Sequence, residues 1–336
     1  MRSKRLVYWA LAIPAILILL IVLIVKLDTA GRGVPRSAAS KAMALALAPR
    51  EACEASQKEH GSHFAAADQG EWYAKYIDYL LERGVLVLED GEEAPDRDYA
   101  ADALTYGEAA YAAEQIQEGL SGALNISTKK YDRAMPLSEW ELFYPSFLEA
   151  ADQAGEVRRE TLLLYGTPDN VPEAAAWTAY TDQGILNFEG VALDACIDRE
   201  IEVYRRGSEI ISLIGVVSEQ VTYRNVWTVP EEDGIRAYLG SISRTFPGIR
   251  ELSEETGGVL ADLELSEGKI KKVSLKKDTI EGKVLSVRED AIEIEGYGTL
   301  KLDPDFRVYK TYGVIREQRK ESILVGYDLG RFVVAK

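Results

Sequence analysis

The chain has 336 residues, a formal net charge of −16 and an apolar content of 47%. This apolar content is typical of packed domains, so it excludes a largely disordered chain, and the length suffices for two or three folding units. The acidic balance excludes nucleic acid as a partner held by bulk charge attraction. Two cysteines, Cys53 and Cys196, are too few for a disulfide-stapled scaffold; one bridge is possible, but two buried thiols are the favoured interpretation.

An uncharged run, LVYWALAIPAILILLIVLIV, occupies residues 6–25 and follows the basic residues Arg2, Lys4 and Arg5. A helix of this length spans about 30 Å, the thickness of the hydrocarbon core of a bilayer. The run is longer than the apolar part of a cleaved signal peptide and does not end in small residues. We therefore predict a transmembrane anchor within residues 1–30, which makes this a single-pass protein of the cell membrane with the bulk of the chain extracytoplasmic.

Helical patterns dominate residues 31–155, which we predict to form one small helical unit. Apolar residues recur at helical spacing in the ranges 34–47, 72–83, 104–117 and 138–151. Thr105 with Glu108, and Ser138 with Glu141, have the spacing of a capping box at a helix start. The unit therefore contains at least four helices, two of them with a predicted start signal.

Large apolar side chains share one face on two of these predicted helices. They are Trp72, Tyr76, Tyr79 and Leu80 on the first, and Trp140, Tyr144, Phe147, Leu148 and Ala151 on the second. A stripe at helical spacing is typical of a face that packs on a core. We predict that these residues are core and do not contact a ligand.

One spacing goes beyond a general helix pattern. Aromatic, aliphatic and small residues follow one another in the order Phe64, Asp68, Trp72, Ile77, Leu80, Gly84 and Leu86. This order resembles the first helix of the S-layer homology repeat, a family whose second helix opens with a Thr-Arg-Ala-Glu signature. The resemblance covers roughly residues 34–118.

Three segments resemble that signature in part. The segment LTYGE keeps Thr105 and Glu108 but lacks the arginine, VPRSA keeps Arg36 but lacks the glutamate, and MPLSE from Met135 is a weaker third copy. In the family these positions contact cell-wall polysaccharide, so the resemblance implies that Arg36, Thr105 and Glu108 are candidate glycan contacts. Because the signature is split between incomplete copies, we expect an affinity of about 1 mM or weaker.

From about residue 160 the hydrophobic period changes to two. Short apolar runs separated by turn residues are typical of an antiparallel sandwich or barrel, and no long helix alternates with the strands as a parallel sheet would require. The strands are predicted at 161–165, 177–180, 185–188, 201–204, 209–213, 221–229, 235–239, 270–275, 280–287, 291–295, 299–302 and 307–309. A linker is predicted at 246–258.

The predicted fold class is therefore multidomain α+β. It consists of an N-terminal transmembrane helix, a small helical S-layer-homology-like unit and antiparallel β sandwich or barrel units. The predicted parts are a cytoplasmic tip and anchor at 1–30, the helical unit at 31–155, a β domain at 156–247 and a small β-barrel or meander at 259–336.

No motif with a recognised chemistry is apparent in the sequence. His60 and His63 could bind a metal together with Asp68 or Glu59, but a structural zinc site wants four ligands and no fourth has suitable spacing. Phosphate-binding glycine loops and the serine-nucleophile motif are missing from the sequence, and its 55 acidic residues nominate no catalytic pair. We predict no catalytic residue, no metal and no cofactor, and favour a protein that is not an enzyme.

Longer segments resemble a second family. YDRAMPLSEWELFYPSF, DREIEVYRRGSEI, GKVLSVREDAIEIEGYG and ILVGYDLGRFVVAK are similar to the N-terminal, non-catalytic region of clostridial proteins of the stage II sporulation protein D and amidase-enhancer group. In that group a peptidoglycan lytic transglycosylase module follows this region, and we expect the module to be missing from this chain.

The second resemblance implies an extracytoplasmic cell-envelope protein with a binding or scaffolding role near peptidoglycan. Its expected partners are the membrane, cell-wall glycan or other envelope proteins, with no nucleic acid. The alternative is the accessory half of a lytic transglycosylase, with the catalytic activity absent from this chain.

Overall fold

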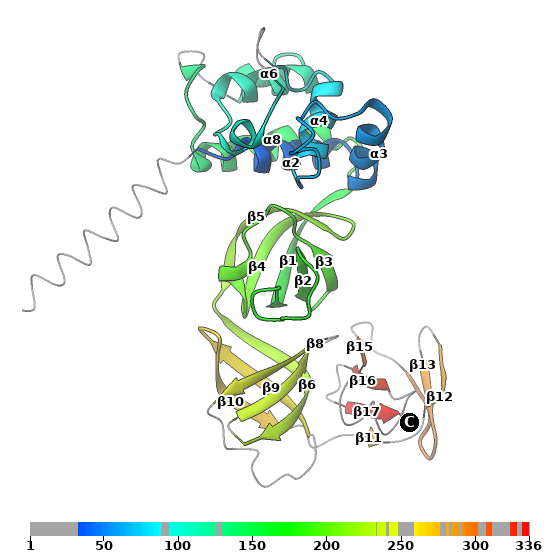
Figure 1. Cartoon of the computed structure of the whole chain (residues 1–336). Coiled ribbons are helices and arrows are strands. Elements are labelled where there is room, and N and C mark those ends of the chain that lie inside the picture. The colour runs from blue at the N-terminus through cyan, green and yellow to red at the C-terminus, as the bar shows by residue number, and fades with distance from the viewer. Residues whose placement is uncertain are drawn as a thin grey trace, which may run out of the picture. The chain divides into compact units, whose positions relative to one another are not determined.

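A computed structural model describes most of the chain from residue 33 onward (Figure 1). The described residues are 33–88, 94–124, 126, 130–232, 234–239, 242–247, 259–275, 280–281, 284–288, 291–301, 307–310, 323–327 and 331–335. They belong to two compact units, divided between residues 158 and 159. The first unit is helical and the second is built from strands.

Seven helices are described in the first unit. They are α2 (Arg36–Leu47), α3 (Arg50–His60), α4 (Ala74–Glu82), α5 (Arg97–Ala101), α6 (Tyr106–Ile116), α7 (Leu120–Ala123) and α8 (Leu137–Ala151). Helix α2 packs against α4, α5 and α8, and almost all of its side chains are buried. Its alanine-rich sequence explains this position, because small side chains let neighbouring helices approach closely on several sides.

Three chain segments meet where α2, α6 and α8 begin. The backbone N–H of Val34 donates to the carbonyl of Met135 (3.0 Å), Leu104 donates to Val34 (2.9 Å), and Met135 donates to Leu104 (2.8 Å). Each of these residues lies two positions before the first residue of its helix. The three hydrogen bonds therefore join three segments, equivalent in their place before a helix, into a closed ring. Gly33 is needed beside the ring, since a Cβ there would lie 2.5 Å from the Cβ of Ala103.

The structure confirms one predicted capping box and shows the other to be wrong. Thr105 and Glu108 form the reciprocal hydrogen bonds of a capping box at the start of α6. Helix α8 instead begins directly after Pro136, which makes no side-chain cap, so Ser138 lies inside the first turn. The proline sets the start because its fixed φ suits a helix entry and it has no N–H to satisfy.

The predicted core faces are largely confirmed. Tyr76, Tyr79 and Leu80 on α4, and Trp140, Tyr144, Phe147, Leu148 and Ala151 on α8, are buried. Trp72 is the exception, because it precedes the first turn of α4 and is only half-buried against Phe64, Tyr73 and Ala74.

The second unit contains the following strands. They are β1 (Val157–Gly166), β2 (Thr178–Thr181), β3 (Gly184–Asn187), β4 (Arg199–Arg206), β5 (Glu209–Ser218), β6 (Gln220–Glu231), β7 (Gly234–Leu239), β8 (Ile242–Pro247), β9 (Val259–Ser266), β10 (Lys269–Leu275), β11 (Ile280–Glu281), β12 (Val284–Val287), β13 (Ala291–Ile294), β14 (Gly298–Lys301), β15 (Arg307–Lys310), β16 (Ile323–Tyr327) and β17 (Arg331–Ala335). A short 3-10 helix, η2 (Asp194–Cys196), lies between β3 and β4.

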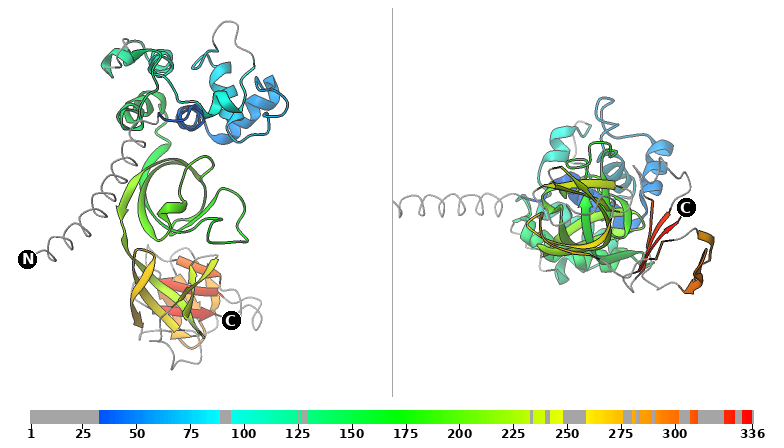
Figure 2. Two further views of the ribbon diagram at one scale, coloured as in Figure 1. Left: turned by 60° about the vertical axis from the view of Figure 1, so that its left-hand side comes forward. Right: turned by 90° about the horizontal axis from the view of Figure 1, so that it is seen from below.

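The first five strands close into a barrel in the order β1-β2-β3-β5-β4, and Figure 2 shows them forming a ring. The pairs β1–β2, β2–β3 and β4–β5 are antiparallel as predicted, whereas β3 pairs with β5 in parallel. The barrel interior is apolar, with Leu162, Leu164, Ile201, Val203 and Ile210 among its fully buried side chains.

The next five strands form an antiparallel sheet in the order β10-β9-β6-β7-β8. Strand β9 pairs with β6, so this sheet crosses the boundary predicted between residues 247 and 259. Phe246 and Pro247, predicted as the start of a linker, belong to β8 instead; residues 248–258 lie outside the described part. Two smaller sheets follow, β11-β17-β16-β15 and β12-β13-β14.

The predicted fold class needs a correction. The described residues are α+β, but none of their helices is long and apolar enough to cross a membrane. The longest of them, α8, has 15 residues, whereas a span needs about 20. The predicted transmembrane segment 1–30 lies outside the described residues, so the fold class is corrected to α+β for the described part, and the predicted localisation stays a prediction.

A buried polar cluster joins the barrel to the five-stranded sheet. Asp198, 4% exposed, lies between η2 and β4 and accepts hydrogen bonds from Arg244 Nη2 on β8 (2.9 Å) and from the hydroxyl of Tyr223 on β6. Arg244 Nη1 also donates to the carbonyl of Tyr165 at the end of β1 (2.6 Å). The rings of Tyr165 and Tyr223 meet edge to face within the surrounding apolar cluster. This cluster therefore fixes the sheet on the barrel.

We expect the β unit to lose stability as the pH rises above about 10, in part through Tyr223. Burial, and then the neighbouring carboxylate of Asp198, raise the pKa of the Tyr223 phenol well above its ordinary value. The unfolded chain releases this proton near about pH 10 while the folded chain retains it, so the free energy of unfolding falls with rising pH. Urea unfolding at about pH 8–11 should show a shallower pH dependence in Tyr223→Phe; equal slopes would contradict this expectation.

Candidate functional site

A pocket of about 440 Å³ opens in the helical unit. It is lined by Arg36, Leu86, Val87, Leu88, Tyr99, Thr105, Glu108, Tyr111, Tyr131 and Asp132. The three candidate glycan contacts from the sequence are all among these residues, although Arg36 is 69 positions from Thr105. The ring of segments at the helix starts brings them together, because it places the first turn of α2 beside the first turn of α6.

An ion pair crosses between two of the related segments. Arg36 Nε donates to Glu108 Oε1 (2.7 Å) and Nη2 donates to Oε2 (3.3 Å), in the two-pronged geometry that arginine and carboxylate favour. Arg36 Nη1 donates to the carbonyl of Tyr99, and the guanidinium lies over the Tyr99 ring, 4.1 Å from its centroid. Burial alone would lower the pKa of Arg36, but the hydrogen bond and charge of Glu108 raise it. The Arg36 guanidinium thus contacts three groups, namely the Glu108 carboxylate, the Tyr99 carbonyl and the Tyr99 ring.

Thr105 completes the cluster through the capping box. Its backbone N–H and its hydroxyl both donate to Glu108 Oε2 (2.8 and 3.0 Å), and its hydroxyl accepts from the Glu108 N–H (3.1 Å). Arg36 of the VPRSA segment therefore pairs with Glu108 of the LTYGE segment, and each of these two segments lacks the residue type that the other contributes. The two residues are 72 positions apart, so neither segment alone reveals the pairing.

A weaker version of the pairing recurs one segment further along the ring. Tyr106 occupies the arginine position of the second copy, and burial followed by a hydrogen bond to Glu139 of the third copy raises its pKa. Lys130 lies near both, with Nζ 3.5 Å from the Tyr106 hydroxyl and 3.5 Å from Glu139 Oε1. Of these two contacts between segments, the one between Arg36 and Glu108 is the shorter ion pair.

Tyrosine rings form much of the pocket wall. Tyr99 is half-buried, Tyr111 is 36% exposed and Tyr131 is 55% exposed. Tyr131 lies against Gly107, where an added Cβ would approach the ring to 2.6 Å. The sequence did not indicate these three tyrosines as pocket residues, because they come from separate segments and share no spacing. The glycine at position 107, which leaves room for the Tyr131 ring, was the one signal that the sequence offered.

Comparisons with known proteins were made for the whole chain. No family model, curated protein or solved structure matches it. The two resemblances noted in the sequence therefore stay predictions, and the site rests on its own geometry.

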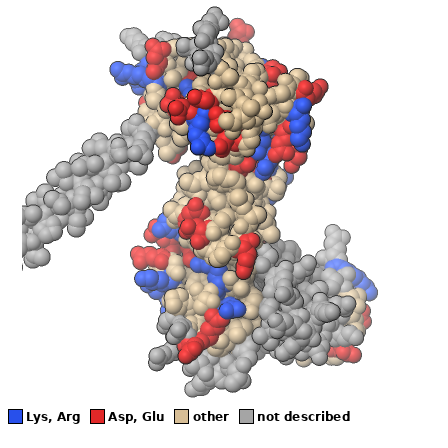
Figure 3. All heavy atoms as spheres, viewed as in Figure 1, with Lys and Arg blue, Asp and Glu red and all other residues tan. Residues whose placement is uncertain are grey.

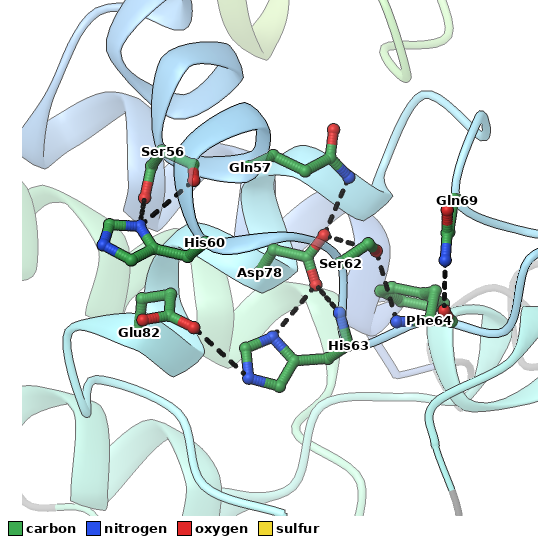
Figure 4. A network of polar contacts seen from close by, with 9 residues as sticks. All are labelled: Ser56, Gln57, His60, Ser62, His63, Phe64, Gln69, Asp78 and Glu82. Carbon is green, nitrogen blue, oxygen red and sulfur yellow. Dashed lines mark hydrogen bonds and ion pairs between the residues drawn. The ribbon is translucent and has the colours of Figure 1, made fainter.

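The two histidines belong to a different polar cluster, drawn in Figure 4. The buried carboxylate of Asp78 on α4 accepts from Gln57 Nε2 (2.7 Å), Ser62 Oγ (2.7 Å) and the His63 N–H (2.9 Å). The His63 ring lies between Asp78 and Glu82, whereas His60 Nδ1 faces the carbonyl of Ser56 (3.1 Å). The two rings thus have separate partners, and the part of the chain that the structure describes holds no group of three or more His, Cys, Asp or Glu side chains arranged so that they could hold a metal ion. The cluster ties the loop after α3 to α4.

Cys53 and Cys196 are buried and form no disulfide with each other, in agreement with the favoured interpretation of two thiols. Burial raises the pKa of the Cys196 thiol, which makes it a poorer nucleophile at neutral pH. Neither cysteine lines the pocket.

Charges of both signs are interspersed on the face of the helical unit drawn in Figure 3. Several ionic side chains of the helical unit are paired, as Arg50 is with Glu54 and Arg97 with Glu71. This face offers no single-sign field that would attract a charged polymer from a distance.

Proposed function

We propose that this chain is a non-catalytic binding or scaffolding protein of the cell envelope whose helical unit binds cell-wall glycan weakly. The observation that carries the proposal is the convergence of Arg36, Thr105 and Glu108 in one pocket. Pockets of about 300–1,000 Å³ with an apolar wall and a few fixed polar groups are the usual form of small-ligand sites. In the β unit a buried polar cluster fixes the five-stranded sheet on the barrel, so in this proposal the β unit acts as a rigid spacer or as a docking surface for other envelope proteins.

A weak affinity is expected because the polar groups of the pocket are already paired with one another. A sugar hydroxyl must compete with these internal hydrogen bonds, and each new bond nets only about 1 kcal/mol after the loss of bonds to water. We therefore expect a dissociation constant of about 1 mM or weaker for one site, and no co-sedimentation of the protein with cell walls at micromolar concentration.

Glycan fragments released from purified cell walls should bind the full-length protein in saturation-transfer NMR, and Arg36→Ala should weaken binding by about tenfold or more. The reason is that removing the guanidinium frees Glu108 and releases Tyr99 from its place in the wall. Arg50→Ala is the matched control, because it removes an arginine–glutamate pair that does not line the pocket.

Gly107→Ala gives a second test in case Arg36→Ala fails to fold. Its φ is not in the left-handed region, so alanine suits the helix, but the new methyl group would displace the exposed Tyr131 ring. Weakened binding with an unchanged melting temperature supports the proposal. Binding that is equal in all variants and the wild type would place the glycan elsewhere and contradict it.

The accessory-transglycosylase alternative stays a prediction from the sequence. A zymogram with purified peptidoglycan tests whether the chain itself cleaves peptidoglycan or only binds it. A cleared band at the position of the purified protein would contradict a purely binding role.

A further inference from the structure

We infer that the pocket selects an uncharged N-acetylated sugar and rejects acidic polysaccharide. The inference deepens the proposed function and rests on it, because it names the chemical class of glycan that the same pocket would take. It follows from three properties of the pocket, namely the pairing of its charges, the exposed apolar surface of its wall and the hydrogen-bonding groups beside that wall.

Among the residues that the structure describes, the lining of the pocket leaves no cation for an acidic ligand. Arg36 is the one basic side chain among these described lining residues, and its guanidinium is engaged by the Glu108 carboxylate and the Tyr99 carbonyl. Asp132, exposed at the rim, adds a second carboxylate. A carboxylated or phosphorylated polymer entering this pocket would meet more negative than positive charge, and binding the arginine would require breaking a nearly buried ion pair, a step that costs much more than a surface contact.

The wall suits a sugar ring that carries an apolar substituent. Val87 and Tyr131 are each 55% exposed, so their apolar surfaces are accessible, and Leu86 and Leu88 continue the same stretch of wall. Aromatic faces pack against the C–H face of a pyranose, and the methyl group of an acetamido substituent gains about 0.8 kcal/mol when buried against such aliphatic side chains.

The polar groups of the pocket, although hydrogen-bonded to one another, match an amide. A hydroxyl can accept from an amide N–H or donate to its carbonyl, and a carboxylate oxygen can accept from the N–H. The Thr105 hydroxyl and the Glu108 carboxylate lie in the pocket beside the tyrosine wall. An acetamido group could therefore place its N–H toward oxygen acceptors and its methyl toward the aliphatic wall at once, which a plain hydroxyl cannot do.

The test compares three trisaccharides on the full-length protein by ligand-observed NMR titration. They are N,N′,N″-triacetylchitotriose, which is neutral and N-acetylated; cellotriose, which is neutral and lacks the acetamido group; and trigalacturonic acid, which is acidic. We expect triacetylchitotriose to bind about tenfold more tightly than trigalacturonic acid and about threefold more tightly than cellotriose.

Two variants assign the effect to the pocket. Tyr131→Ala should abolish the preference for triacetylchitotriose, whereas Tyr297→Ala, which removes a tyrosine of equal exposure from the β unit, should leave it unchanged. Glu108→Gln should let trigalacturonic acid bind, because it leaves the charge of Arg36 without a carboxylate partner.

The outcomes separate this inference from the proposed function. Equal or tighter binding of trigalacturonic acid to the wild type, lost in Tyr131→Ala, would overturn the neutral-sugar inference and leave glycan binding intact. Equal binding of cellotriose and triacetylchitotriose would overturn the acetamido part. If none of the three binds at about 10 mM, both the inference and the proposed glycan site are wrong.

Discussion

Replacing Asp198 by asparagine should destabilise the β unit by about 3–5 kcal/mol, since it removes the carboxylate charge of a buried ion pair and leaves the charge of Arg244 uncompensated. The side chain of Asp198 is 5% exposed, that of Arg244 is 15% exposed, and both lie where the barrel meets the five-stranded sheet. Asparagine is the right substitution because residue 198 has a φ of 62°, a conformation that Asn tolerates better than other side chains. A drop in the urea midpoint with an unchanged slope would identify lost stability without a change in the surface exposed on unfolding.

An exposed pair serves as the control for this effect. Arg159 on β1 makes two hydrogen bonds of 2.7 Å to Glu202 on β4, a geometry as good as that of the buried pair. Because Arg159 is exposed to water, Arg159→Ala should leave the urea midpoint almost unchanged. A large effect at both positions would mean that any ion pair on this barrel matters, and that the buried junction has no special role.

A second substitution then measures the coupling. Arg244→Met keeps much of the apolar stem of the side chain and removes the charge, so the double variant with Asp198→Asn should recover part of the loss. If the two single effects simply add, the pair is not a coupled unit, and the sheet is held on the barrel by the surrounding apolar cluster alone.

The local features of the fold could be predicted from the sequence where one segment carries the whole signal. The capping box at Thr105 needs only Thr105 and Glu108 on the same turn, and the structure contains it. Strand β9, which lies between the predicted linker and the strand predicted at 270–275, was not predicted, although Ala261, Leu263 and Leu265 alternate with acidic residues. This alternation is the local signal that would have identified it.

Features that depend on distant segments could not be predicted. The partner of Arg36 is 72 positions away, and the rings that line the pocket come from three separate segments. Asp198 and Arg244 show no spacing that would pair them, and their contact follows from how β8 packs beside the end of the barrel. The three related segments at Val34, Leu104 and Met135 were visible as partial copies, yet the ring of backbone hydrogen bonds that unites them is a property of the fold.

Replacing Tyr144 by alanine should destabilise the helical unit by about 3–5 kcal/mol. Tyr144 on α8 is 2% exposed, stacks on Trp140 with ring centroids 5.3 Å apart, and donates from its hydroxyl to the carbonyl of Ala42 on α2 (3.0 Å). Alanine would leave a cavity between α8 and α2, and it would also remove this hydrogen bond to the Ala42 carbonyl on α2. Thermal unfolding of the full-length protein, followed by helical circular dichroism, measures the loss.

Two further variants separate packing from hydrogen bonding at this position. Tyr144→Phe keeps the ring and removes only the hydroxyl, so it should cost about 1 kcal/mol, the loss of one buried hydrogen bond to the Ala42 carbonyl. Leu142→Ala, on the same helix at 77% exposure, should change stability by less than about 0.5 kcal/mol. If Tyr144→Phe costs as much as Tyr144→Ala, the hydrogen bond to α2 dominates over the ring, and α8 is held on α2 by polar contacts. A loss in Leu142→Ala comparable with that in Tyr144→Ala would mean that the exposed face of α8 is covered by another part of the protein, and the core assignment for this helix would have to be redrawn.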